Sequence, residues 1–431
     1  MDTNAPKTPA TLPFAAWQAM TPAVAAREVH ARIAALPPAL HSAALAWLRF
    51  EQELAMELDL TGATQPLHGV PYLLKDLFDF HGVPTRAGST FLDKVRPTPV
   101  QDSAIVQRLR ELGATCAGKT HLVEFASGLT GENPHYGDCP HPRFPDRLTG
   151  GSSSGSAALV AAGVVPLAIG TDTGGSVRVP AAWCGLYGFR LTPGDELIRD
   201  AFPLASTMDT AGWFTATAAD MLTTCQALAG KSPRKTKLRG CHLPMGALFA
   251  KPDAETALAC DATAGKICPP ADAATVGKLL DSWRDAVDAY ITIGLSEAHH
   301  VHRDWLAPYH EHYDQVIWRR FTDAGHYTAE QIVRAHTTLE KVRVAFRQFF
   351  TTHDFLVLPA VPRPAPRKSD CTPELRRNIL TLTAPASLGG LPVLTIPVPL
   401  PSGLTAGLQV ILPAINSPVM PWILSNCSGG L

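Results

Sequence analysis

Apolar residues recur every three to four positions along several stretches of the chain, a spacing that predicts amphipathic helices with one buried face. Pro37 and Pro38 separate the first two of these stretches, because proline interrupts a helix. In the third stretch, Asp102 is a candidate N-cap and Gly113 a candidate stop. The predicted helices cover residues 21–36, 41–58, 101–114, 152–165, 215–230, 271–293 and 328–350.

Short apolar runs lie between these helices and predict buried strands. They cover residues 115–120, 165–173, 354–362 and 391–400. A further short apolar stretch, residues 67–80, contains Lys75. Two stretches rich in small residues and proline, 127–150 and 231–270, are predicted to be loops. Strands that alternate with helices in this way predict an α/β layered fold.

Composition narrows the classes of protein that fit this pattern. Hydrophobic residues make up 46% of the 431 residues and charged residues 17%, which is typical of a folded protein with a large core. The length is compatible with one large domain or with two to three average ones. The formal net charge of −1 gives no electrostatic support for nucleic-acid binding.

Cysteine usage and the absence of targeting signals suggest a cytoplasmic protein. Nine cysteines occur without a CxxC pair, so we expect reduced and mostly buried thiols. Cys260 and Cys268 are close in sequence, and a disulfide between them stays an open possibility. Residues 1–13 are expected to be loose and do not resemble a signal peptide, and no apolar run is long enough to span a membrane.

The segment AIGTDTGGSVRVP, residues 168–180, places Gly174 and Gly175 directly before Ser176. Glycine tolerates positive φ, so backbone N–H groups in this turn can converge on one point and bind an oxyanion. A serine at the end of such a turn is a candidate nucleophile for acyl transfer. An ordinary tight turn, with Ser176 as a helix cap, is the other interpretation that the segment allows.

A second glycine- and serine-rich cluster, GGSSSGS, covers residues 150–156. It is not a phosphate-binding P-loop, because that motif requires a lysine that is absent here. It contains the pattern G-x-S-x-G, but a nucleophile elbow follows a hydrophobic strand, and the preceding residues are polar and rich in proline.

These two clusters together resemble the signature of the amidase signature family of serine hydrolases. The resemblance is densest from the LTGGSSSGS segment to the segment GFRLTPG, and it extends to PLHGVPYLLKDLFD, to GKTHLVEFASGLTGENPHYG and to the C-terminal LGGLPVLTIPVP. It implies a single domain over residues 1–431, an α/β/α layered fold with a central mixed β-sheet. The weakest match, within residues 231–350, is expected to be a more variable helical region that packs on the core and shapes the substrate pocket.

The resemblance also implies roles for individual residues. Ser176 is the expected nucleophile, Lys75 the general base, and Ser152 the proton relay, joined to Gly151 by a cis peptide. The backbone N–H groups of the turn form the expected oxyanion hole, and Ser153 hydrogen-bonds near the lysine. The full set implied is Lys75, Ser152 and Ser176 (catalytic), Thr173, Gly174, Gly175 and Ser176 (oxyanion hole), Gly151 and Ser153 (supporting), and Ser127, Gly128 and Leu129 (substrate-binding).

Lys75 fits the part of a base, because a charged amine in the apolar segment VPYLLKDLF is costly and burial favours its neutral form. A surface lysine paired with Asp76 or Asp79 is the alternative. Asp172 and Arg178, which flank the nucleophile, are expected to form structural ion pairs, with Asp209 as a plausible partner for Arg178.

The expected activity is hydrolysis of a small-molecule carboxylic amide through an acyl-Ser176 intermediate, without a cofactor or metal and with a homodimer possible. Five histidines between His299 and His312 match no known metal-ligand spacing. Two alternatives stay open. One is an amidotransferase A-type subunit that releases ammonia from glutamine for a tRNA-dependent complex, and the other is a non-catalytic binding protein with the same fold.

Overall fold

The computed structural model describes residues 11–233, 235 and 237–427. Most of the expected loose segment, residues 1–13, therefore lies outside the described residues, and the first helix begins at Phe14. The α-helices of the described part are α1 (Phe14–Gln18), α2 (Pro22–Ala34), α3 (Pro38–Ala44), α4 (Glu51–Asp59), α5 (Leu92–Val95), α6 (Ala104–Glu111), α7 (Ser154–Ala161), α8 (Arg178–Cys184), α9 (Ala218–Ala229), α10 (Ala254–Ile267), α11 (Ala273–Trp283), α12 (Ala286–Leu306), α13 (Gln315–Ala324), α14 (Ala329–Phe349), α15 (Pro373–Leu388) and α16 (Val419–Cys427).

A ten-stranded mixed sheet runs through the described part of the chain, in the order β1-β3-β2-β6-β8-β7-β11-β12-β10-β9. Its strands are β1 (Leu45–Leu48), β2 (Val70–Lys75), β3 (Ala114–Thr120), β6 (Leu167–Thr171), β7 (Tyr187–Arg190), β8 (Ala211–Thr215), β9 (Gly240–His242), β10 (Phe355–Pro359), β11 (Val393–Pro399) and β12 (Thr405–Ile411). Strand β2 is parallel to both β3 and β6, whereas β6, β8, β7, β11, β12 and β10 follow one another in antiparallel pairs. This confirms the predicted α/β fold with a central mixed sheet.

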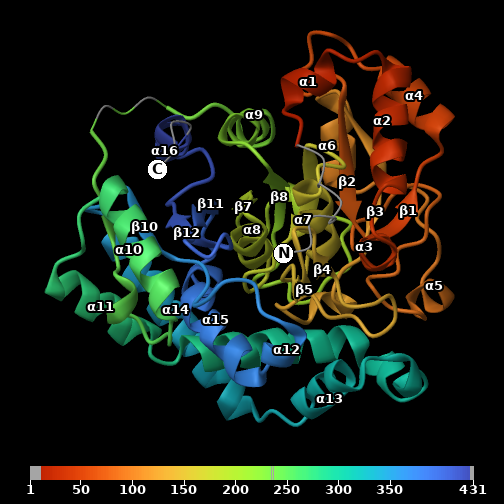
Figure 1. Cartoon of the computed structure of the whole chain (residues 1–431). Helices are drawn as coiled ribbons and strands as arrows, with labels where there is room; N and C mark the ends of the chain where they lie inside the picture. Colours follow the sequence, from red (N-terminus) through yellow and green to blue (C-terminus); the bar gives the residue numbers. More distant parts are fainter. Residues whose placement is uncertain (1–10, 234, 236, 428–431) are drawn as a thin grey trace.

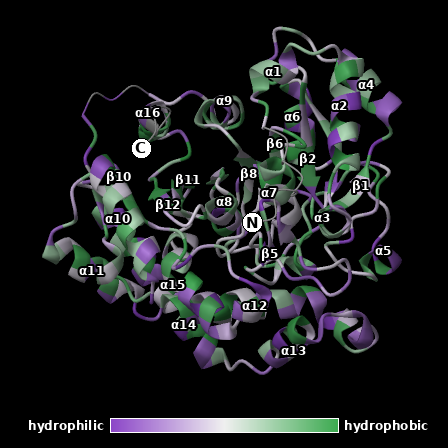
Figure 2. Cartoon of the chain, in the orientation of Figure 1, coloured by the Kyte–Doolittle hydropathy of each residue, from purple (hydrophilic) through white to green (hydrophobic). Residues whose placement is uncertain are grey.

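Helices cover both faces of the sheet because successive strand residues point to opposite sides. Leu73 packs in a cluster with α7, whereas its neighbours Tyr72 and Leu74 pack in another with α6 and α9. In Figure 1 the N-terminal strands lie at the right of the sheet and the C-terminal strands at the left, with α12 and α13 below. Figure 2 shows that α12 and α14 carry both hydrophobic and hydrophilic residues, as the helical periodicity predicts.

Several predicted elements were wrong in detail. Residues 231–270 are not all loop, because α10 and β9 lie there; Asp253 caps α10 through the N–H of Thr256. The predicted helix over 41–58 is interrupted by β1, and residues 271–293 divide into α11 and α12. The predicted loop over 127–150 contains a two-stranded sheet, β4 (Pro140–His141) and β5 (Phe144–Leu148).

The expected cap of α6 was also wrong. Ser103, not Asp102, occupies the N-cap position, and the Asp102 carboxylate instead accepts hydrogen bonds from the N–H of His81 and from Arg110. None of the helices in the described ranges combines the length and apolar character that a bilayer crossing requires. Cys260 and Cys268 are buried free thiols, so the disulfide left open above is not formed.

Two helical glycines give a matched test of this packing. A Cβ at Gly155 in α7 would collide with the backbone oxygens of Ala44 and His121, whereas a Cβ at the exposed Gly265 in α10 would meet no atom within 4 Å. Gly155→Ala should therefore lower the free energy of unfolding by about 1–3 kcal/mol. Gly265→Ala should raise it by about 0.5–1 kcal/mol, because alanine favours a helix over the unfolded chain. Urea denaturation measures both, and equal signs would contradict the packing described.

Candidate active site

The predicted lysine and serines meet at the ends of two neighbouring strands. Lys75 is the last residue of β2, and Thr171 is the last residue of the parallel strand β6. Ser152 and Ser153 immediately precede α7, which packs against both strands. The peptide between Gly151 and Ser152 is cis, as the resemblance implies. The parallel strands therefore bring residues that are distant in the sequence into one polar cluster.

The amine of Lys75 is fully buried and lies among three hydroxyl groups. Its Nζ donates hydrogen bonds to Ser152 Oγ at 2.8 Å, to Ser153 Oγ at 3.0 Å and to Thr171 Oγ1 at 2.8 Å. Ser153 Oγ in turn donates to the backbone oxygen of Thr171. Ser152 and Ser153 thus lie where they were predicted, and Thr171 is a partner that the sequence analysis missed.

No carboxylate forms an ion pair with Lys75 among the residues that the structure describes. Asp76 pairs with Lys119 at 2.5 Å and Asp79 pairs with Arg96 at 2.6 Å, so the alternative of a surface lysine is wrong. Burial lowers the pKa of Lys75 to about 7, and the more distant charges of Asp172 and Asp209 oppose this shift. Near neutral pH a large fraction of this amine is uncharged and able to accept a proton.

The turn before Ser176 depends on both glycines, but in the described structure positive φ is found at Gly175 and not at Gly174. Gly175 adopts φ +130°, and a Cβ at Gly174 would collide with the hydroxyl of Tyr290. Of the four predicted oxyanion donors, Gly175 already has an acceptor, because its N–H donates to Asp172 Oδ1 at 2.8 Å. Among the described residues, no acceptor is recorded for the N–H groups of Thr173, Gly174 and Ser176, so these three stay candidates.

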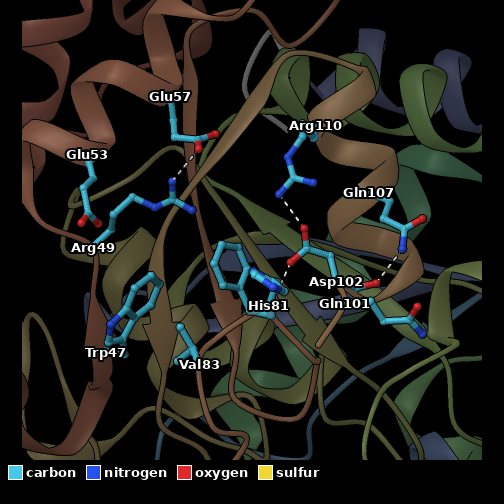
Figure 3. Close-up of a pocket in the computed structure, with 11 residues that line it drawn as sticks. Trp47, Arg49, Glu53, Glu57, His81, Val83, Gln101, Asp102, Gln107 and Arg110 are labelled. Carbon is cyan, nitrogen blue, oxygen red and sulfur yellow. Dashed lines mark hydrogen bonds and ion pairs between the residues drawn. The ribbon is translucent and has the colours of Figure 1, made fainter. Parts of the chain in front are cut away.

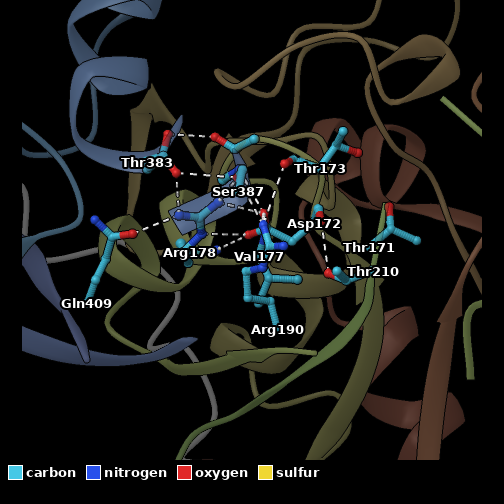
Figure 4. A network of polar contacts seen from close by, with 12 residues as sticks. Thr171, Asp172, Thr173, Val177, Arg178, Arg190, Thr210, Thr383, Ser387 and Gln409 are labelled. Carbon is cyan, nitrogen blue, oxygen red and sulfur yellow. Dashed lines mark hydrogen bonds and ion pairs between the residues drawn. The ribbon is translucent and has the colours of Figure 1, made fainter. Parts of the chain in front are cut away.

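The Asp172 side chain holds this turn in place. Its carboxylate accepts hydrogen bonds from the N–H groups of Gly175, Val177 and Arg178 and forms ion pairs with the buried side chains of Arg178 and Arg190. Figure 4 shows both guanidinium groups pointing toward this carboxylate. Burial alone would raise the pKa of Asp172, but the two arginines outweigh it and lower the pKa well below its usual range.

The predicted pairing of Arg178 with Asp209 was wrong, because Asp172 is its carboxylate partner. Asp209 instead accepts a hydrogen bond from Thr173 Oγ1 at 2.6 Å and from two backbone N–H groups. The remaining donors of Arg178 are satisfied by the C-terminal part of the chain, namely Thr383 O, Ser387 Oγ and Gln409 Oε1.

A cavity of about 410 Å³ opens beside Ser176. The predicted substrate-binding residues Ser127, Gly128 and Leu129 line it, together with Thr173. Helices α12, α13 and α15 also line this cavity, and the sequence analysis named none of their residues as substrate-binding. Its members are Tyr290, Ile291, Gly294, Leu295, Arg320, Pro373, Arg376, Arg377 and Leu380.

The link between the hydroxyl groups of Ser152 and Ser176 is less direct than the link between Lys75 and Ser152. Among the hydrogen bonds of the described ranges, none joins the two Oγ atoms; the recorded link runs from Ser153 N–H to the backbone oxygen of Ser176 at 3.3 Å. The transfer of a proton between these two hydroxyls therefore stays a prediction.

The histidines between residues 299 and 312 do not gather at one point. His299 contacts the backbone oxygen of Phe321, and the buried His302 contacts the hydroxyl of Tyr313. Burial lowers the pKa of His302 to about 3. Over the ranges that the structure describes, no group of three or more His, Cys, Asp or Glu side chains is arranged to hold a metal ion.

Comparison with known proteins identifies a family model and relatives that match most of this chain. A family model described as Amidase matches residues 25–260 and 278–417. The chain is 30% identical over 389 residues to the AtzE component of 1-carboxybiuret hydrolase from Pseudomonas sp. (strain ADP), covering 84% of this chain and 82% of that protein. It is 31% identical over 407 residues to a glutamyl-tRNA(Gln) amidotransferase component from Akkermansia muciniphila, covering 82% and 84%. A solved structure described as a crystal structure of amidase superposes with a TM-score of 0.82 at 29% identity, covering 94% of this chain and 96% of that one.

The buried ion pairs behind the turn can be tested through stability. Asp172→Asn leaves two buried guanidinium groups without a counter-charge and should lower the free energy of unfolding by about 3–5 kcal/mol. Glu330→Gln, which removes an ion pair with Arg334 on the exposed surface of α14, is the control and should change stability little. Chemical denaturation measures both variants. Equal effects would mean that the Asp172 network does not anchor the fold.

Proposed function

Since the chain belongs to the amidase family, we propose that it hydrolyses the C–N bond of a small carboxylic amide through an acyl-Ser176 intermediate, in the cytoplasm. The observation that supports this most is the buried amine of Lys75, hydrogen-bonded to Ser152 and to Ser153, whose N–H donates to the backbone oxygen of Ser176. Ser176 in turn lines the cavity. An uncharged amine at that place is a base that a serine nucleophile needs.

The first half of the reaction forms the acyl-enzyme. Lys75 accepts a proton from Ser152 while Ser152 accepts one from Ser176, and the Ser176 oxygen bonds to the amide carbon. The N–H groups of Thr173, Gly174 and Ser176 stabilise the negative oxygen that results. The proton then returns from Lys75 through Ser152 to the leaving nitrogen, the C–N bond breaks, and ammonia or an amine departs.

The second half uses water in place of the serine. Water loses a proton to Lys75 through Ser152 and attacks the acyl carbon, and the Ser176 oxygen leaves with that proton. The carboxylic acid product ionises on release. In this scheme Tyr290, beside Gly174, and Ser153, beside Lys75, exchange no protons themselves. They position the groups that react.

A second candidate function follows from the 31% identity to the amidotransferase component. In that case the chain would release ammonia from glutamine for a partner complex. Purified chain that hydrolyses small amides with no other protein present supports the first function. Glutamine turnover that appears only when copurifying proteins are added back supports the second.

Loss of the nucleophile or the base should abolish turnover. Ser176→Ala and Lys75→Ala are each expected to lower kcat/KM on an amide substrate by about a thousandfold or more, because the nucleophile and its base act as one unit. Ser369→Ala, at an exposed serine, is the control and should leave the rate unchanged. A fluorophosphonate probe should label Ser176 in the unaltered chain, as located by peptide mass mapping. Near-normal turnover by Ser176→Ala would rule out the acyl-enzyme.

The pH dependence should report the ionisation of Lys75. The protonated amine cannot accept a proton, and burial brings its pKa to about 7. For an uncharged amide, kcat/KM should therefore rise about tenfold per pH unit below pH 7 and level off above it. A profile that is flat from pH 5 to pH 9 would show that Lys75 is not the base.

A further inference from the structure

The cavity beside Ser176 contains one guanidinium group without an acidic partner. Arg320, on α13, is partly buried and lines the cavity, and its Nη1 donates a hydrogen bond to the backbone oxygen of Ser127 at 3.2 Å. Among the described residues, no carboxylate lies within ion-pair distance of it. Burial, followed by the neighbouring charge of Arg376, lowers the pKa of Arg320. A cation in this position gains from any anion that enters the cavity.

The other two arginines that line the cavity are already paired. Arg376 contacts Glu132 at 2.5 Å, and Arg377 contacts Asp288 at 2.8 Å. Lys368 also contacts Glu132, at 3.3 Å, so that carboxylate is shared between two cations. The positive charge of Arg320 is therefore opposed at a distance by the carboxylates of Asp314 and Glu132, and by no carboxylate in contact among the described residues.

A second cavity in the same protein shows arginine side chains whose positive charges are matched by carboxylates in contact. This cavity, of about 680 Å³, lies near β1 and α6 and contains none of the predicted catalytic residues (Figure 3). Its arginines both have acidic partners, Arg49 with Glu57 at 3.3 Å and Arg110 with Asp102 at 2.5 Å, and Glu53 adds a further carboxylate. That cavity gives no reason to expect an anion, whereas the cavity beside Ser176 does.

We propose that the amide substrate carries a carboxylate at the end remote from the scissile bond, and that Arg320 binds this carboxylate. This inference rests on the proposed function. The planar guanidinium fork matches the two oxygens of a carboxylate. The same cavity is also lined by Ile291, Leu295 and Leu380, which suit an apolar connecting chain. Arg320 is thus a residue that selects the substrate, distinct from those that cleave it.

Matched substrates test the charge directly. Glutaramate and pentanamide have equal chain length, but only the first carries a carboxylate, on the acyl side. N-Acetyl-5-aminopentanoate and N-pentylacetamide form the corresponding pair with the carboxylate on the amine side. The unaltered enzyme should favour the anionic member of at least one pair by about tenfold or more in kcat/KM.

Arg320→Ala should remove that preference. We expect kcat/KM for the favoured anionic amide to fall about 10- to 100-fold, as for the loss of a charge-assisted hydrogen bond, while the neutral amide changes less than about threefold. Arg320→Lys should retain part of the preference, because it keeps the charge and loses the fork. Arg319→Ala, at the exposed neighbouring arginine of the same helix, is the matched control and should preserve the preference.

A measurement on the unaltered enzyme covers the case in which a variant does not fold. Where the acyl-side pair shows the preference, glutarate should also inhibit competitively at a concentration at least about tenfold lower than pentanoate; where the amine-side pair shows it, 5-aminopentanoate should inhibit at a concentration about tenfold lower than pentylamine. No preference in either substrate pair would overturn the role of Arg320. If neutral amides are still hydrolysed through Ser176 in that case, the proposed function stands and only this inference fails.

Discussion

The removal of one lysine amine from water is the constraint on which the rest of the site depends. Lys75 is fully buried at the end of β2, and its hydrogen-bond partners are three neutral hydroxyl groups. A carboxylate in contact would keep the amine protonated. The adjacent Asp76 could have supplied one, but it pairs with Lys119 on the next strand, β3. The parallel pairing of β2 and β3 therefore helps to keep the amine of Lys75 uncharged.

The turn that carries Ser176 depends on a buried group that keeps its charge, in contrast to Lys75. Asp172 is ionised in the interior because two guanidinium groups and three backbone N–H groups compensate its charge. This negative charge also acts at a distance on Lys75 and limits how far burial lowers its pKa. The Asp172 network thus holds the turn of the proposed nucleophile and also affects the pKa of the proposed base. In this protein positioning and acid–base balance share the same residues.

The sequence predicted which residues cluster around Lys75 better than it predicted the elements that surround them. The glycine turn, Ser152 and Ser153 were predictable because their residue types are unusual and closely spaced, and the family resemblance linked them to Lys75. The partner of Arg178 was misassigned because both Asp172 and Asp209 are acidic candidates in the sequence, and only the folded turn shows that Asp172 forms the ion pair.

Elements whose structure depends on contacts with residues distant in the sequence were harder to predict. Residues 45–48 continue a helical apolar pattern, yet they form β1 because β3 offers an edge to pair with. Helix α10 has many small residues, which gave it the composition of a loop. Arg320 reaches the cavity only through the packing of α13, which no local pattern encodes.

The hydrogen bonds from Arg178 to Thr383 and Gln409 have a consequence for synthesis of the chain. Ser176, the proposed nucleophile, is synthesised more than two hundred residues before these acceptors. The hydrogen-bond network behind its turn can therefore be completed only when the C-terminal part of the chain has left the ribosome.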